Sequence, residues 1–124
     1  MPSRQAASKE LAEIYKILAH PDRIRLIEEL RSTEIDVNTL AELLSLPGPR
    51  VSQHLSLLKA HRLVEERREG RRHLYHLVQP ELASWIVEGL SFVEGRIEAV
   101  SKSSIETARE LWSTPERKTA SDSK

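Results

Sequence analysis

Residues 40–64 read "LAELLSLPGPRVSQHLSLLKAHRLV" and contain two amphipathic segments separated by a Pro-Gly-Pro break at 47–49. The first segment predicts a short helix over residues 39–46, in which Thr39 and Glu42 have the spacing of a capping box. The second predicts a helix whose first turn contains the second proline of the break, because proline already has a helical φ. Two short helices joined by a tight turn with glycine predict a helix-turn-helix, whose second helix can enter the DNA major groove.

The second of these helices has an apolar side and a polar side. At about 100° per residue, Val51, Leu55 and Leu58 lie on one side, which is therefore expected to be buried. His54 lies on the same side, and Leu57 lies at its margin. The polar side carries Pro49, Ser52, Gln53, Ser56 and Lys59, with Arg50 at its edge. Glutamine can pair with adenine, serine with base edges or phosphates, and arginine with guanine or phosphate, so this side is predicted to contact double-stranded DNA.

Residues 63–78 contain two strand-like runs around Glu69 and Gly70, which predict a β-hairpin. Four arginines lie near its tip: Arg67, Arg68, Arg71 and Arg72. Such a tip can contact phosphates or the minor groove, and each neutralised phosphate releases counterions and strengthens binding. The candidate DNA-binding residues are Thr39, Arg50, Ser52, Gln53, Ser56, Arg67, Arg71 and Arg72.

Three further helices are predicted around this centre, so the fold class is mainly α with a small β-hairpin. One covers residues 8–19, and the next begins at Pro21, where proline followed by Asp22 suits a first helical turn. The last begins at Pro80 and carries a long apolar stripe with alternating steps of four and three residues. A stripe of this kind predicts a partner helix.

A single domain is expected over residues 8–112, because a chain of 124 residues is long enough for one core. Residues 1–7 are expected to form a flexible N-terminus. The tail at 113–124 has almost no apolar residues, so it is predicted to be disordered, since it cannot bury enough surface to fold.

The composition excludes several classes of function. The net charge is zero, which alone argues against a nucleic-acid partner, but the basic residues are concentrated between Arg50 and His76 and the acidic residues lie mostly elsewhere. The chain has no cysteine, which excludes disulfides, thiolate zinc sites and a cysteine nucleophile. No apolar run approaches the roughly 20 residues of a membrane span, and residues 1–10 lack the apolar stretch of a signal peptide, so a cytoplasmic location without a membrane partner is expected.

Three motifs together resemble those of winged helix-turn-helix regulators of the ArsR/SmtB type. They are "LAHPDRIRLIEEL" (18–30), the 40–64 stretch and "RREGRRHLYHL" (67–77). The resemblance implies a homodimeric repressor, joined through its first and last helices, that binds an inverted repeat and is released by a signal. It implies DNA contacts through the second helix of the helix-turn-helix, which is the recognition helix, and through the predicted hairpin, which is the wing. The contacting residues are Arg50, Ser52, Gln53 and Ser56 on the recognition helix and Arg71 and Arg72 on the wing. The implied dimer interface contains Leu11, Ile14, Leu82, Ile86, Leu90, Val93 and Ile97.

The chain departs from this family where its members sense their signals. Members that sense through thiolates have cysteines entering the third helix, where this chain has Asp36 and Asn38. Other members bind zinc-like metals through histidines of the last helix, but residues 80–100 contain no histidine. No metal and no cofactor are therefore expected. Arg62 stands where relatives often have a left-handed glycine, a difference that costs about 1 kcal/mol.

Of the five histidines, His20, His54 and His61 are expected to have structural roles. His20, His54 and His61 are scattered over different predicted elements. His73 and His76 differ by three along a predicted strand, so they should point to opposite faces and cannot chelate one ion together. Either of these two histidines can instead help to line the DNA surface of the wing.

Two interpretations remain open for Trp85, Phe92 and Trp112: packing in a dimer core, or binding of a small apolar effector of unknown identity between helices. The chain has no glycine-rich phosphate loop and no recognisable pair of nucleophile and base, so it is not expected to be an enzyme and no catalytic residue is assigned. The alternative to a DNA-binding regulator is a winged-helix module that docks on an acidic protein without specific DNA binding. The salt dependence and sequence preference of duplex binding distinguish the two.

Overall fold

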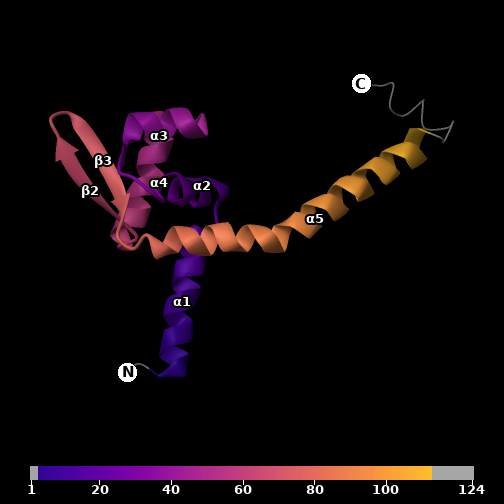
Figure 1. The fold of residues 1–124 in the computed structure, drawn as a ribbon, viewed down its shortest axis with the longest axis horizontal. Helices are drawn as coiled ribbons and strands as arrows, with labels where there is room; N and C mark the ends of the chain where they lie inside the picture. Colours follow the sequence, from indigo (N-terminus) through magenta and orange to yellow (C-terminus); the bar gives the residue numbers. More distant parts are fainter. Residues whose placement is uncertain (1–2, 113–124) are drawn as a thin grey trace. The chain divides into compact units, whose positions relative to one another are not determined.

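The computed structural model describes residues 3–112, except for the side chains at 100–105, 108–109 and 111–112. The chain divides into two compact units, Met1–Val87 and Glu88–Lys124. The first unit contains α1 to α4, a three-stranded sheet and the start of α5 (Glu81–Trp112), which continues into the second unit (Figure 1). The tail that the sequence predicts to be disordered, 113–124, lies outside the described residues, as does the side chain of Trp112.

The first two helices are α1 (Arg4–Leu18) and α2 (Pro21–Glu29). The helix α1 begins at Arg4, four residues before the predicted start, because the Ser3 hydroxyl accepts a hydrogen bond from the Ala6 amide at 3.1 Å and caps the helix. The predicted flexible N-terminus therefore includes residues that are helical. The predicted start of α2 at Pro21 is confirmed.

The helix-turn-helix consists of α3 (Val37–Leu44) and α4 (Gly48–Ala60). The predicted capping box between Thr39 and Glu42 is wrong, because the cap is Asp36: its carboxylate accepts hydrogen bonds from the Thr39 amide at 3.4 Å and from the Thr39 hydroxyl at 2.6 Å. Thr39 therefore lies inside the first turn of α3 rather than before it. The predicted break between the two helices is confirmed.

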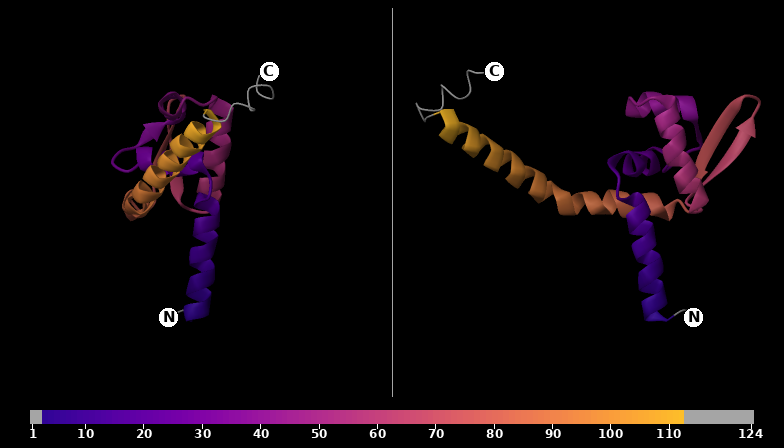
Figure 2. Two further views of the ribbon diagram at one scale, coloured as in Figure 1. Left: turned by 90° about the vertical axis from the view of Figure 1, so that its right-hand side faces the viewer. Right: turned by 180° about the vertical axis from the view of Figure 1, so that it is seen from behind.

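Three antiparallel strands form one small sheet: β1 (Ile35–Asp36), β2 (Val64–Glu69) and β3 (Arg72–Leu77), in the order β1-β3-β2. The predicted hairpin is confirmed, and Glu69 pairs with Arg72 across a two-residue turn. Gly70, the first turn residue, has φ 63°, which glycine adopts without strain. The sequence did not predict β1, because a strand of two residues shows no alternation. Figures 1 and 2 show the hairpin beside α3 and α4.

The core of the first unit lies between the helices and the inner face of the sheet. Val51, Leu55 and Leu58 of α4 are 0% exposed, as their predicted apolar side requires. The other buried apolar residues are Ile17, Leu18, Leu26, Ile27, Leu30, Leu40, Leu44, Val64, Leu74, Tyr75, Leu77, Leu82 and Ala83. Leu82, a predicted dimer-interface residue, belongs to this core.

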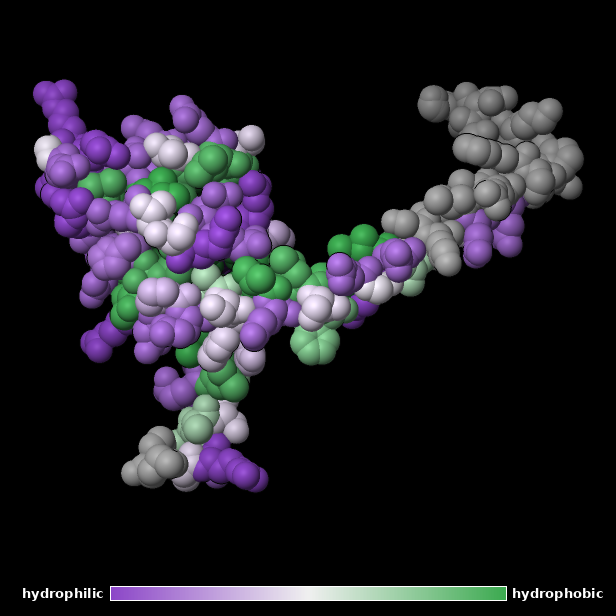
Figure 3. Space-filling view, in the orientation of Figure 1, coloured by the Kyte–Doolittle hydropathy of each residue, from purple (hydrophilic) through white to green (hydrophobic). Residues whose placement is uncertain are grey.

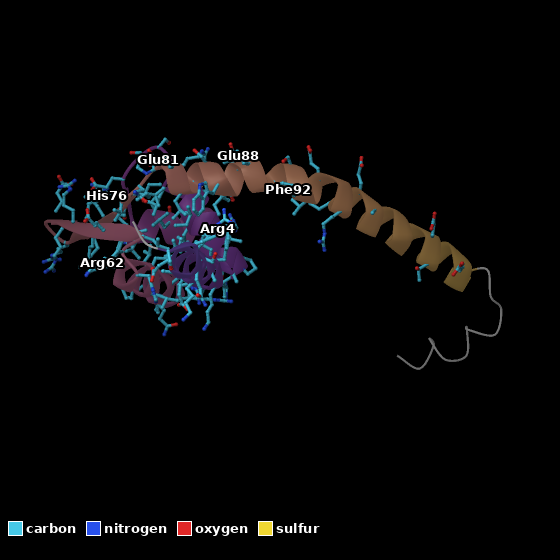
Figure 4. All side chains as sticks on the ribbon, turned by 90° about the horizontal axis from the view of Figure 1, so that it is seen from below. Arg4, Arg62, His76, Glu81, Glu88 and Phe92 are labelled. Atoms are coloured by element: carbon cyan, nitrogen blue, oxygen red, sulfur yellow. The ribbon has the colours of Figure 1, made fainter. Side chains whose placement is uncertain are left out.

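Large apolar side chains of α5 are exposed along the described part of the helix (Figure 3). Leu90, Val93 and Ile97 are 47%, 37% and 62% exposed, and Phe92, labelled in Figure 4, is 82% exposed. Exposed apolar rows of this kind are typical of interaction surfaces. None of the helices in residues 3–112 combines the length and apolar character that a bilayer span requires.

Candidate nucleic-acid interface

The polar side of α4 is exposed along its whole length. Arg50, Ser52, Gln53 and Ser56 are all exposed, while the opposite side of the helix is buried in the core. The inner side of the helix is held by its buried apolar side chains and by His54, so the outer side chains are free to make polar contacts. The structure therefore places the four predicted DNA-binding residues of α4 on one accessible face.

A cavity of about 540 Å³ lies between the start of α3, the helix α4 and the wing, which is the β2–β3 hairpin. It is lined by Ser52 of α4, by Asn38 of α3, and by Arg71 and Arg72 of the wing, among others. Residues from distant parts of the sequence, from Asn38 to Arg72, therefore share one concave surface. The predicted combination of recognition helix and basic wing tip is brought together here.

Two of the wing arginines are already engaged by carboxylates. Arg67 forms a bidentate pair with Glu34, with Nε–Oε2 3.0 Å and Nη2–Oε1 2.7 Å. Arg72 lies 3.4 Å from Asp36 Oδ1 and 3.5 Å from Glu69 Oε1. The Arg67 guanidinium, by its hydrogen bond, holds the pKa of the Glu34 carboxyl below its usual value. Phosphate must compete with these carboxylates for Arg67 and Arg72.

Arg68 and Arg71 form no ion pair with any residue in the part of the chain that the structure describes. The register of the hairpin pairs Arg68 with His73 and Val64 with Leu77, so Arg68 lies on the sheet face that also carries the buried Val64. This is the face toward α4, since Lys59 of α4 bonds Glu66 on the same face. The sequence analysis names Arg68 among the tip arginines but not among the candidate DNA-binding residues, and only the strand register identifies the sheet face on which it lies.

Lys59 connects the end of α4 to the wing. Its ammonium donates a hydrogen bond to Glu66 Oε1 at 2.9 Å, and His73 contacts the other Glu66 oxygen. The Lys59 hydrogen bond, and then that of His73, hold the pKa of the Glu66 carboxyl below its usual value, and the same bond raises the pKa of Lys59. Lys59 therefore positions the wing against α4.

His73 and His76 contact different carboxylates, as their predicted opposite orientations require. His73 contacts Glu66, whereas His76 Nε2 lies 3.1 Å from Glu65 Oε1 on the other sheet face. His76 Nδ1 also lies 3.7 Å from Glu34 Oε2. The two histidines do not form a common metal site.

His20 and His54 lie side by side, so the prediction that they are scattered is wrong. Their ring centroids lie 4.5 Å apart, and with Asp22 they form the one group of three side chains in the described part of the chain that are close enough to ligate a metal ion together. Arg23 Nε donates to His54 Nδ1 at 3.3 Å, and Arg50 Nε lies 3.6 Å from Asp22 Oδ2. The guanidinium groups of Arg23 and Arg50 would repel a divalent cation at this position. The two histidines and Asp22 therefore suit contacts with these arginines better than a metal ion.

His54 is mostly neutral near pH 7. Burial, together with the neighbouring His20 and Arg23, lowers the pKa of its imidazole, while Asp22 acts in the opposite direction. Its side chain is 12% exposed, in agreement with the predicted buried orientation. His54 therefore joins the core of the first unit to the polar group at the start of α2.

Comparison with known proteins agrees with this geometry. Residues 20–66 match the family described as "Bacterial regulatory protein, arsR family". The chain is 34% identical over 80 residues to the HTH-type transcriptional regulator KmtR of Mycobacterium tuberculosis, over 64% of this chain and 62% of KmtR. It is 33% identical over 86 residues to the biofilm growth-associated repressor of Agrobacterium fabrum, over 69% of this chain and 74% of that repressor.

A solved structure has the same fold. It is the homodimeric winged helix-turn-helix DNA-binding domain of "a possible ArsR-family transcriptional regulator" from Mycobacterium bovis, with a TM-score of 0.65 and 27% identity over 80% of this chain and 93% of that domain. The chain spans less than two thirds of KmtR, 62% of its length. It covers 74% of the Agrobacterium repressor at 33% identity. The fold is therefore a winged helix-turn-helix, and the chain belongs to the arsR family of bacterial regulatory proteins.

Proposed function

We propose that the protein is a sequence-specific DNA-binding transcriptional regulator that acts as a homodimeric repressor on an inverted-repeat operator. The observation that carries this proposal is the cavity that exposed Ser52 of α4 shares with Arg71 of the wing, together with the exposure of the adjacent Gln53. Polar side chains on the recognition helix read base edges, and the wing cation neutralises phosphate beside them.

The recognition step uses α4 in the major groove. Gln53 and Ser56 supply amide and hydroxyl groups that match base edges, and Thr39, exposed in the first turn of α3, can bond the phosphate backbone. Arg68 and Arg71 supply positive charges on the wing, and neither forms an ion pair with a carboxylate of the described residues. Since phosphate contacts are not sequence-specific, the wing contributes affinity and α4 contributes discrimination.

We propose that the exposed apolar side chains of α5 and α1 pack against a second copy of the chain. Leu90, Val93 and Ile97 of α5 are exposed, and Leu11 of α1 is 38% exposed. Ile14 and Ile86, which are also predicted at the interface, are partly buried against the core of their own unit. The related Mycobacterium bovis domain is described as homodimeric. In a two-fold dimer, two α4 helices can enter grooves about 34–36 Å apart.

A small effector is a weaker proposal. Ile14, Leu82 and Trp85 line a cavity of about 90 Å³ in the first unit, with Arg62 and Glu81 at its edge. The Tyr15 ring lies next to Trp85, with the two ring centroids 6.3 Å apart and the rings tilted by 35°. Sites for drug-sized ligands have volumes of about 300–1,000 Å³, so packing is the better account of Trp85 in one copy of the chain.

Fluorescence anisotropy tests the proposed function. The full chain is titrated into labelled duplex DNA from upstream of its own gene and into a scrambled duplex of equal length, at near-physiological salt and at low salt. Selective binding that weakens steeply with salt supports a DNA-binding regulator. Equal weak binding to both duplexes contradicts an operator at that position. No binding even at low salt supports instead the module that docks on an acidic protein.

A further inference from the structure

Asp22, in the first turn of α2, lies beside Arg50, in the first turn of α4. Asp22 Oδ2 is 3.6 Å from Arg50 Nε, and the two side chains are 17% and 55% exposed. The carboxylate is therefore on the protein side of the pair and the guanidinium is on the solvent side. We propose that Asp22 is a specificity-determining residue that orients Arg50 to read a guanine, an inference that rests on the proposed DNA-binding function.

The geometry of the pair leaves the two terminal nitrogens of Arg50 free. Asp22 approaches Nε, while Nη1 and Nη2 have no hydrogen-bonding partner among the residues that the structure describes. The outer nitrogens of a guanidinium form a planar fork that matches the O6 and N7 acceptors of guanine. The Asp22 carboxylate next to Nε holds the guanidinium beside α2 by ion pairing and leaves this fork free. An unrestrained arginine at the same position would instead sample many rotamers and contact phosphates as readily as bases.

The position of Asp22 is itself determined by two histidines. His20 caps α2 by accepting the Asp22 amide hydrogen on Nδ1 at 3.1 Å, which places the Asp22 side chain at the positive end of the helix. His54 Nε2 lies 3.4 Å from Asp22 Oδ2. Oδ2 is buried and accepts no hydrogen bond of normal geometry from the described residues. A buried carboxylate oxygen without a hydrogen bond is stabilised by a nearby cation, and Arg50 is such a cation.

Arg23 determines which way His54 faces. Its Nη1 donates to the Ile17 carbonyl at 2.8 Å and its Nε donates to His54 Nδ1 at 3.3 Å. Because Nδ1 accepts this bond, the neutral imidazole carries its hydrogen on Nε2, the nitrogen that faces Asp22. A continuous polar chain therefore runs from the end of α1 through Arg23, His54 and Asp22 to Arg50. The same contacts explain why these groups converge without a metal ion.

Two roles of Asp22, balancing the charge of Arg50 and orienting its side chain, predict different effects on DNA binding. If Asp22 only balanced the charge of Arg50, its loss would strengthen binding to every duplex, since one negative charge would leave the DNA surface. If Asp22 orients Arg50, its loss removes the preference for guanine at one position in each half-site and leaves the other preferences intact. Base preference, rather than affinity, is therefore the diagnostic measurement.

The experiment is a binding selection from a pool of randomised double-stranded DNA, followed by sequencing of the bound fraction. The full-length wild type, Asp22→Asn, Arg50→Ala and the double variant are compared. Glu29→Gln is the matched control, because it removes one carboxylate from the same helix without a contact to Arg50. Circular dichroism melts check the folding of each variant. If Asp22→Asn does not fold, Asp22→Thr is used in its place, because threonine is also tolerated near the start of a helix.

The wild type is expected to prefer guanine about tenfold at one position per half-site, as one bidentate pair allows. Asp22→Asn and Arg50→Ala are expected to lose this preference alone, and the double variant should lose no more than either. A guanine preference that survives in Asp22→Asn, or an Arg50→Ala variant that weakens all sites equally, would overturn the inference. A wild type that enriches no sequence would overturn the proposed function itself, and this inference with it.

Discussion

Glu34 and Arg67 lie 33 residues apart in the sequence and form a bidentate ion pair, with distances of 3.0 Å and 2.7 Å between their atoms. The pair joins the residue before β1 to the outer face of β2. It therefore fixes the wing to the segment that leads into α3. Arg67 is a predicted DNA contact whose charge is already matched within the protein.

The two wing arginines Arg71 and Arg67 are expected to differ in their effect on DNA binding. Arg71→Ala should weaken binding to all duplexes about equally and reduce the slope of log K against log salt by about 0.9, the contribution of one phosphate contact. Arg67→Ala, the matched control, should change the slope less, because Glu34 already binds this side chain. Anisotropy titrations at several salt concentrations measure both slopes. A larger change for Arg67→Ala than for Arg71→Ala would contradict the assignment.

Gln53→Ala is expected to reduce discrimination between the operator and single-base variants by about tenfold, because an amide that pairs with adenine is lost. Gln79→Ala makes the same chemical change outside α4 and should leave discrimination unchanged. Competition with a panel of substituted duplexes measures the ratio. If Gln53→Ala keeps the wild-type ratio at every position, the proposed docking of α4 is wrong.

Leu55→Ala is expected to lower the free energy of unfolding by about 2–5 kcal/mol, because it removes a fully buried side chain from α4 and leaves a cavity. Leu43→Ala, at a position 45% exposed on α3, should cost less than about 1 kcal/mol. Urea denaturation followed by circular dichroism measures both values. Equal losses would show that α4 does not form the centre of the core.

Arg62→Gly is expected to stabilise the protein by about 1 kcal/mol, because Arg62 has φ 62° and glycine adopts this left-handed conformation without strain. The expectation of a left-handed residue here is confirmed. Arg68→Gly is the control: it lies within β2, where glycine should destabilise by about 0.5–1 kcal/mol. Thermal melts compare the variants, and a destabilised Arg62→Gly would mean that side-chain contacts outweigh backbone strain.

Stability is expected to fall as the pH falls through the ordinary histidine range. Burial lowers the pKa of His54 in the folded protein, so between its lowered value and about 6.5 the unfolded chain binds more protons. The stabilisation from neutral His54 is therefore fully present above about pH 6.5 and is lost progressively below it. Urea titrations across this range measure the slope. The slope should decrease in His54→Gln, and an unchanged slope would assign it to other groups.

The local pattern of the sequence determined most of the helical elements. Pro21, the Pro-Gly-Pro break and Gly70 restrict the backbone by themselves, so the start of α2, the turn before α4 and the hairpin could be predicted from neighbouring residues alone. The spacing of Val51, Leu55 and Leu58 likewise determined which side of α4 is buried, because helical periodicity is a local property. The polar side and its proposed role followed from the same periodicity.

Only the tertiary structure decided which charges are free. The strand β1, the Asp36 cap, the Glu34–Arg67 pair and the contact of Asp22 with Arg50 all depend on segments brought together by folding. Sequence spacing carries no information about such distances, since an ion pair depends on atoms within about 4 Å whatever their separation along the chain. The sequence by itself therefore determined the helix-turn-helix and its polar side, whereas long-range packing decided which arginines remain available to DNA.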